Sequence, residues 1–196
     1  MIEVRRFLGL GRIFGMRMGR RSRNSLLRAL RQDTGGVAAV EFALIGTFLC
    51  VGMLNVVDVA AYAYQQMEVA NAAEMGAQAA WQTCDQTMLP ATTACAGLTS
   101  AVTAAIQSTA LGQSVTLVSG SPSEGYYCLN SSNALQRVSD VTSKPSDCSA
   151  TGEAGVSPGD YIQVQVTYTY APLFLDITVA GLLATPIEET AFMRLG

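Results

Sequence analysis

The longest apolar run in the chain covers residues 37–57, VAAVEFALIGTFLCVGMLNVV, and Glu41 and Asn55 interrupt it near its two ends. In an α-helix this run extends about 31 Å at about 1.5 Å per residue, close to the hydrocarbon thickness of a bilayer, about 30 Å. The pattern therefore predicts a membrane-spanning helix. A buried helix of a soluble core is the alternative.

Residues 58–83, DVAAYAYQQMEVANAAEMGAQAAWQT, contain no proline, and alanine dominates them. Helix propensity is therefore high, and nothing separates this segment from the apolar run. We predict one continuous helix from about Val37 to Trp81. A stripe of mostly small side chains at spacings of three and four would let another element approach closely; it consists of Val59, Tyr62, Gln66, Val69, Ala73, Gly76, Ala77 and Ala80.

The remainder changes from helical to alternating patterns. A second helix is predicted over 98–111 with Gly112 as its stop, and a turn over 120–125. In 159–173, apolar or aromatic residues at even positions from 162 to 170 alternate with Gln and Thr, which is typical of a half-buried strand. Further strands are predicted at 114–120, 126–129, 135–138 and 187–195, with a short helix or connection over LDITVAGLLA (175–184). These elements predict an α+β fold in which a long N-terminal helix packs on a small antiparallel sheet.

Charge divides the chain further. Residues 1–36 carry a net charge of +7 and the rest −10. Arginines flanking an apolar helix orient its N-terminus to the cytoplasm. We expect four parts: a basic leader (1–36), a transmembrane or assembly helix (37–57), its exported continuation (58–83) and a globular exterior domain (84–196).

The cysteines agree with export. Cys50 lies in the apolar run, whereas Cys84, Cys95, Cys128 and Cys148 lie in polar surroundings. An even number of such cysteines suits an oxidising compartment. Sequence alone allows three pairings of the four; we favour Cys84–Cys95 and Cys128–Cys148, because each closes a short loop.

Catalytic patterns are absent from the sequence. It has no histidine, no phosphate-binding glycine loop, no nucleophile elbow and no HExxH motif. Glu188 and Glu189 are adjacent, so on a strand they point to opposite faces and make no acid/base pair. Asp140, Asp147, Glu153 and Asp160 lack calcium-ligand spacing. We expect no enzyme activity, no cofactor, no metal, no nucleic acid and no small-molecule substrate.

Glu41 remains unexplained by a simple membrane anchor, because a lone carboxylate in lipid costs several kcal/mol. Cleavage after Gly36 would remove the basic leader and give Val37 a free ammonium. Glu41 would then lie four residues from that ammonium, on the same helix face. A pair with this ammonium, in the same chain or in a neighbouring subunit, would offset the cost and define the axial register between subunits.

Here the sequence resembles a known family. A glycine followed by VAAVEF, opening an apolar helix after a basic leader, resembles a type IV prepilin cleavage site. GGVAAVEFALI and the following YAYQQMEVANAAEMGAQAA are similar to TadE/TadG-like pseudopilins of the tight-adherence (Tad/Flp) pilus system, and VQVTYTYAPL with GLLATPIEETAFMRLG resembles the ending of that family. The likeness covers roughly 37–83 and 160–196.

The resemblance implies cleavage by a prepilin peptidase between Gly36 and Val37, with Glu41 as the helix glutamate and Phe42 at the aromatic position. It implies a minor pilin or pseudopilin that takes part in assembly or initiation of a Tad-type pilus for surface adherence. Its partners would be the peptidase, other pilins and Tad assembly proteins. It would cross the bacterial inner membrane once, with a cytoplasmic N-terminus and a periplasmic or extracellular C-terminal domain, and would be associated with the pilus.

Three alternatives remain open. An uncleaved membrane-anchored protein could bind a ligand or partner with its exported domain. An ordinary secreted protein could be cut after Ala61-Tyr62-Ala63, which has the A-x-A form of a signal-peptidase site. An enzyme is the third class.

Overall fold

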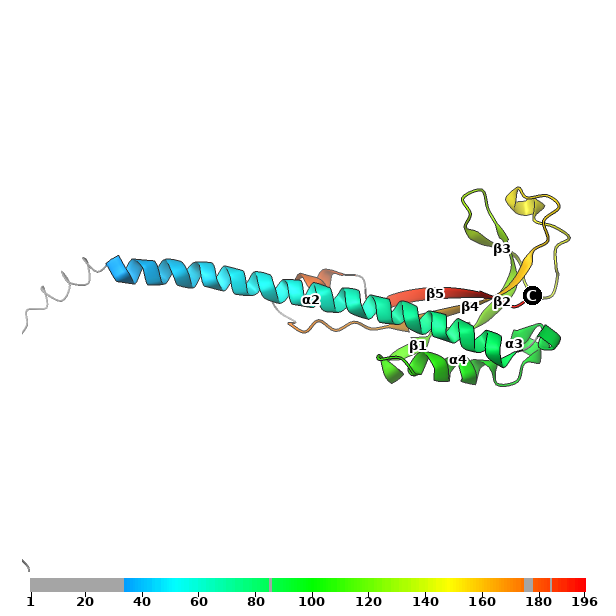
Figure 1. The fold of residues 1–196 in the computed structure, drawn as a ribbon, viewed down its shortest axis with the longest axis horizontal. Helices are drawn as coiled ribbons and strands as arrows, with labels where there is room; N and C mark the ends of the chain where they lie inside the picture. The colour runs from blue at the N-terminus through cyan, green and yellow to red at the C-terminus, as the bar shows by residue number, and fades with distance from the viewer. Residues whose placement is uncertain (1–33, 85, 175–177, 184) are drawn as a thin grey trace, which may run out of the picture. The chain divides into compact units, whose positions relative to one another are not determined.

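The computed structural model describes residues 34–84, 86–174, 178–183 and 185–196 (Figure 1). The chain divides after Leu49 into two compact units. Of the predicted leader, only Thr34–Gly36 falls within the described residues. The predicted boundaries at 57 and 83 stay predictions.

The long helix predicted from the sequence is confirmed. Helix α2 covers Thr34–Thr83 as one uninterrupted element. It begins three residues before the expected Val37, so that the Gly35-Gly36 pair lies in its first turn. The alanine-rich composition and the absence of proline explain why no break separates its apolar and polar halves.

The remaining described residues form an α+β unit, as predicted. Its helices are α3 (Ala91–Ala94) and α4 (Leu98–Gln107), with short 3-10 turns η1 (Gln86–Met88), η2 (Gly112–Ser114), η3 (Ser149–Thr151) and η4 (Val179–Leu182). Its strands are β1 (Val115–Leu117), β2 (Ser123–Leu129), β3 (Leu135–Ser139), β4 (Gly159–Tyr168) and β5 (Ile187–Arg194).

All strand pairs in this sheet are antiparallel, and β4 is its centre. Strand β5 pairs with β4 over Tyr161–Tyr168. Strands β2 and β1 pair with β4 at its beginning and its end, so both lie along the edge opposite β5. Strand β3 extends the sheet beyond β2. This arrangement leaves the outer edge of β5 without a strand partner among the described residues.

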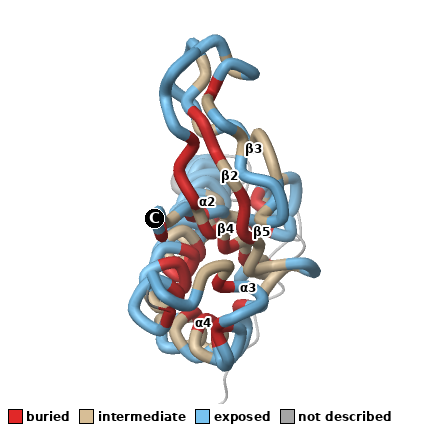
Figure 2. Tube along the Cα trace, turned by 90° about the vertical axis from the view of Figure 1, so that its right-hand side faces the viewer, coloured by how far each residue is buried: buried red, intermediate tan, exposed pale blue. Residues whose placement is uncertain are grey.

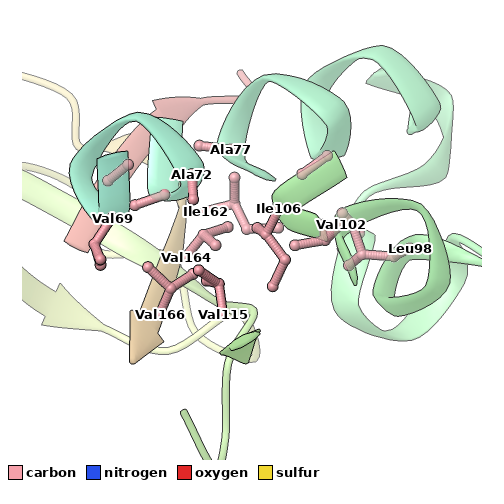
Figure 3. Packing of buried hydrophobic residues seen from close by; sticks show 14 of the residues in the cluster. Val69, Ala72, Ala77, Leu98, Val102, Ile106, Val115, Ile162, Val164 and Val166 are labelled. Atoms are coloured by element: carbon pink, nitrogen blue, oxygen red, sulfur yellow. The ribbon is translucent and has the colours of Figure 1, made fainter. Parts of the chain in front are cut away.

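The core lies between one face of this sheet and the two longer helices. The residues of β4 at 162, 164 and 166 are fully buried, as the alternation predicts, and they meet α2 and α4 (Figure 3). Buried residues gather at this junction, whereas the region around β3 is mostly exposed (Figure 2). The members of the cluster from the helices are Val69, Ala72, Ala73, Ala77, Ala80, Leu98, Val102 and Ile106.

Several boundaries differ from the sequence-based expectation. Helix α4 ends at Gln107 rather than near Gly112, because the hydroxyls of Ser108 and Thr109 donate to backbone carbonyls three residues back. Strand β2 begins at Ser123, inside the predicted turn, because that residue pairs across the sheet with Gln163. Strand β4 ends at Tyr168, although Tyr170 is still buried.

Candidate functional site: an uncovered apolar helix and its processing sequence

The N-terminal half of α2 is apolar and largely uncovered by the other residues that the structure describes. Its most apolar 18-residue window has a mean hydropathy of 2.2, and none of that window is buried. Phe42 and Phe48 are 79% and 84% exposed. Fully burying one such side chain is worth about 1.5–3 kcal/mol. A surface of this kind suits an apolar environment, and the helix is long and apolar enough to cross a membrane.

Two uncharged polar side chains of the apolar run donate hydrogen bonds to their own helix. The Thr47 hydroxyl donates to the carbonyl of Ala43 at 2.7 Å, and the Asn55 amide donates to the carbonyl of Val51 at 2.8 Å. Such local bonds remove much of the cost of placing a polar group in lipid. An ionised carboxylate only accepts hydrogen bonds and finds no free donor inside a helix. Glu41, which is exposed, therefore differs in kind from Thr47 and Asn55.

The predicted processing sequence lies at the start of this helix. Gly36 has an open surrounding, since a Cβ added there would meet no atom within 4 Å. Val37 and Glu41 are one helical turn apart, and both are exposed. The helix thus places them on one face, but Val37 gains an ammonium only if the bond to Gly36 is cut. Phe42 lies on the adjoining face and is 79% exposed.

Asp58 was not singled out from the sequence, yet it is fully buried where the apolar run ends. Its Oδ1 accepts from the Tyr170 hydroxyl at 3.1 Å and from the Leu173 N–H at 2.8 Å. One turn earlier, Asn55 Oδ1 accepts from the Val179 N–H at 2.7 Å. The segment after β4 is therefore fastened to α2 by hydrogen bonds. An aspartate directly after an apolar run was the signal available in the sequence.

The stripe of small residues on α2 serves the chain's own core. Gly76 lies against Ile106 and Val164, and Val69, Ala73, Ala77 and Ala80 are buried. Two members of the stripe are exposed rather than buried. Val59 is 39% exposed, and Gln66 is exposed and donates to Glu189 Oε1 at 3.3 Å.

The structure contains both disulfides that the sequence favours. Cys84–Cys95 joins the end of α2 to the residue after α3, and Cys128–Cys148 joins β2 to the loop before η3. All four cysteines are buried. The first bridge holds the C-terminal end of α2 against the domain, and the second ties down the long polar loop. Cys50, the free cysteine among the described residues, is exposed on the apolar half of α2.

The acidic residues weighed for calcium are dispersed by the fold. Asp140 accepts from Thr142, and Asp147 accepts from the Ser149 N–H at 3.1 Å, so each is used in a local turn. Hydrogen bonds from the Thr142 side chain and N–H lower the pKa of Asp140. As expected, Glu188 and Glu189 point apart: Glu188 is exposed, and Glu189 reaches Gln66. No group of three metal-ligating side chains occurs in the part of the chain that the structure describes.

Asp160 and Glu124 form a buried acidic pair that the sequence did not indicate. They are 7% and 4% exposed. Glu124 accepts from the N–H groups of Ala91 and Thr92 at 2.9 and 2.8 Å, at the start of α3. Burial and then the charge of Glu124 raise the pKa of Asp160 to about 6, although Lys144 acts in the opposite direction. The folded state therefore favours the protonated form of Asp160.

Replacing Asp160 by asparagine is expected to stabilise the protein at neutral pH. The pKa of Asp160 in the folded state lies above the ordinary value of 3.8. The contribution of Asp160 to the free energy of unfolding is therefore complete below about pH 4 and is lost as the pH rises through about 6. Asparagine does not ionise, so Asp160→Asn avoids this loss. Its free energy of unfolding at pH 7 should exceed that of the unmodified chain by up to about 3 kcal/mol. Chemical unfolding of the full chain in detergent, followed by Trp81 fluorescence between pH 4 and 8, measures the difference.

Asp140→Asn is the matched control, because its pKa shift has the opposite sign. It should destabilise the protein at neutral pH, and this effect should vanish in acid. A constant advantage of Asp160→Asn at every pH would contradict the assignment.

A cavity of about 310 Å³ lies beside the second disulfide. Aromatic, amide and charged side chains line it together with Cys128 and Cys148; they include Tyr127, Asn130, Asn133, Glu153, Tyr161 and Arg194. Its size is at the lower end for a small-molecule site. It lies in the α+β unit and involves none of the predicted processing residues.

Comparison with known proteins gives a match that lies within α2. No curated protein matches the chain. No solved structure matches it either. Residues 36–78 match the model of the family described as TadE-like protein. The matched segment begins at Gly36 and includes the exposed apolar half of α2 and most of its packed half. Residues 160–196, which resemble the family's ending, are not part of the match. The chain thus carries a TadE-like segment at residues 36–78.

Proposed function

We propose that this chain is a minor pilin or pseudopilin that takes part in the assembly or initiation of a Tad-type pilus for surface adherence. The observation that carries the proposal is the coincidence of the TadE-like match with an apolar helix window of which none is buried by the residues that the structure describes. A helix exposed along this length suits a subunit that first lies in a membrane and then packs against neighbouring helices. The arginines before it favour a cytoplasmic N-terminus in the inner membrane.

In this proposal a prepilin peptidase cuts between Gly36 and Val37. Both Gly35 and Gly36 lie in the first turn of α2, where each glycine costs about 1 kcal/mol of helix stability relative to alanine. The first turn therefore unwinds readily into the extended form that a peptidase needs. Cutting leaves Val37 with an ammonium and removes the arginine cluster.

Glu41 then sets the axial register between neighbouring helices during assembly. A carboxylate in lipid costs several kcal/mol, and a nearby ammonium offsets this cost. The axial stagger that places the Val37 ammonium of one subunit beside Glu41 of its neighbour is favoured. Other staggers leave both charges unpaired. The partners are thus other pilins and Tad assembly proteins, with Phe42 on the packing face.

The role is structural rather than enzymatic in this proposal. The sequence offers no histidine, and two of the carboxylates weighed for chemistry, Asp140 and Asp147, accept hydrogen bonds in local turns. Neither a cofactor nor a nucleic acid is required by the mechanism.

A second candidate is an uncleaved, membrane-anchored protein whose exported domain binds a ligand. The cavity beside Cys128–Cys148 favours it, since tyrosines and an arginine converge there. The secreted alternative is less favoured, because Ala61-Tyr62-Ala63 lies within α2 and the Tyr62 ring packs edge-on against Tyr170 at 5.1 Å.

The mature N-terminus tests the proposal. When the chain is expressed with its full leader in a bacterium that has a Tad system, intact-mass and N-terminal peptide analysis of the membrane fraction should find Val37 first. A chain that begins at residue 1 would favour the uncleaved anchor, and one that begins at Tyr64 would favour the secreted protein. Either result would refute the pilin assignment.

A further inference from the structure

The segment between β4 and β5 exposes large apolar side chains beside the point where the apolar run of α2 ends. Leu182 is 88% exposed, Leu173 62% and Val179 54%. We name these three residues the apolar tip. Neighbouring residues are less exposed: Ala180 is buried, and Leu183 packs on the core. Val179 and Leu182 are therefore exposed although residues next to them contact the core.

Hydrogen bonds hold the tip at one level of α2. The Val179 N–H donates to Asn55 at 2.7 Å, and the Leu173 N–H donates to Asp58 at 2.8 Å. The Thr178 hydroxyl accepts from the Ala180 N–H at 3.0 Å and shapes the turn η4. Figure 1 shows this turn, in orange-red, beside α2 and apart from the sheet.

That level is where a bilayer surface would lie. Asn55 is 18 residues after Val37 in the sequence, which corresponds to about 27 Å of helix, close to the hydrocarbon thickness of about 30 Å. In the sequence of residues 170–187 the only charged side chain is Asp176, which lies outside the described residues. The exposed Tyr64 adds an amphipathic ring on the next turns of α2, a side chain enriched at membrane–water interfaces.

We propose that the apolar tip Leu173, Val179 and Leu182 inserts into the outer leaflet of the membrane in which α2 is anchored. The lipid surface is the occupant because the tip continues, at the same level of α2, the apolar surface that the helix already presents to lipid. Insertion gives the exported domain a second membrane contact besides the helix and limits its rotation about the helix axis. This inference rests on the proposed membrane anchoring of residues 37–57.

Tryptophan reporters in lipid test the inference. In a Trp81→Phe background, which removes the single native tryptophan, single reporters are placed at Leu182, at Phe48 and at Leu129. Leu129 is 50% exposed at the end of β2 and serves as the matched control. The full chain is reconstituted at low density in phosphatidylcholine/phosphatidylglycerol vesicles whose acyl chains carry bromine near the headgroup or near the methyl end.

Leu182→Trp is expected to emit at shorter wavelength than Leu129→Trp and to be quenched by the shallow bromine more than by the deep one. Phe48→Trp should be quenched by the deep bromine, and Leu129→Trp by neither. Val179→Trp is a second tip reporter in case Leu182→Trp fails to fold, and it should give the same shallow quenching.

Each other outcome overturns the inference in a different way. Quenching of Phe48→Trp without quenching of either tip reporter shows an anchored helix whose tip stays in water. If tip emission shifts to shorter wavelength without bromine quenching, and the shift grows with protein density, the tip contacts another subunit rather than lipid. Absence of quenching at Phe48 removes the membrane anchoring itself, and with it the proposed function.

Discussion

Replacing Gly36 by leucine is expected to leave an unprocessed chain in the membrane, longer than the mature protein by the leader of residues 1–36. The substitution should not disturb the fold, because an added Cβ at Gly36 meets no atom within 4 Å and the position is exposed. Leucine changes two properties of the cleavage site. It adds bulk next to the bond to be cut, and it stabilises the first turn of α2 by about 1 kcal/mol, against the unwinding that cleavage requires.

Immunoblotting and intact-mass analysis of the membrane fraction measure this effect. Gly52→Leu is the matched control, since Gly52 lies on the same helix in equally open surroundings and outside the cleavage site. It should be processed normally. Gly36→Ala separates the two causes, because it stabilises the helix without adding a bulky group. Normal-length mature protein from Gly36→Leu would show that the bond after Gly36 is not the one that is cut.

Replacing Gly76 by valine is expected to cause a large loss of stability in the α+β unit, about 3 kcal/mol. An added Cβ at this position would lie 2.8 Å from Cγ2 of Ile106 and 3.0 Å from Cγ1 of Val164. Both of those side chains are fully buried, so neither moves aside without disturbing the core. The gain in helix propensity over glycine, below about 1 kcal/mol for valine, does not offset such overpacking.

Denaturant unfolding of the full chain in detergent, followed by Trp81 fluorescence, measures the loss. Gln78→Val places the same side chain two residues further along α2 at an exposed position and should change stability by less than about 1 kcal/mol. If Gly76→Val were as stable as the unmodified chain, the close approach of α2 to α4 and β4 would be absent in solution.

These two predictions concern opposite halves of one helix, and the halves differed in how well their roles could be predicted. For the apolar half, composition and length were sufficient to predict a helix long and apolar enough to cross a membrane, because both properties are read from its own residues; its membrane role stays a prediction. The packed half was predicted as a helix, with most of its contact stripe correct. Its partner was not predictable, because helical spacing shows which face is buried but not what covers it.

The sheet shows the same division. Strand β4 was predicted from its own alternation, and Ile162, Val164 and Val166 are buried as expected. Strand β2 begins with Ser-Glu-Gly, which has low strand propensity, and its start depends on pairing with β4 about 40 residues later. Such a start is decided by the partner strand rather than by local preference.

The sequence by itself determined the continuous helix, the α+β class, the central strand, the favoured disulfide pairs and the candidate processing site, because each depends on neighbouring residues, on spacing or on a short motif. Tertiary structure alone decided the burial of Asp58, Glu124 and Asp160. Their partners, Tyr170 for Asp58, the start of α3 for Glu124, and Glu124 for Asp160, lie more than 30 residues away along the chain. A buried carboxylate is tolerated where distant donors satisfy it or where its pKa rises, and only the fold brings those groups together.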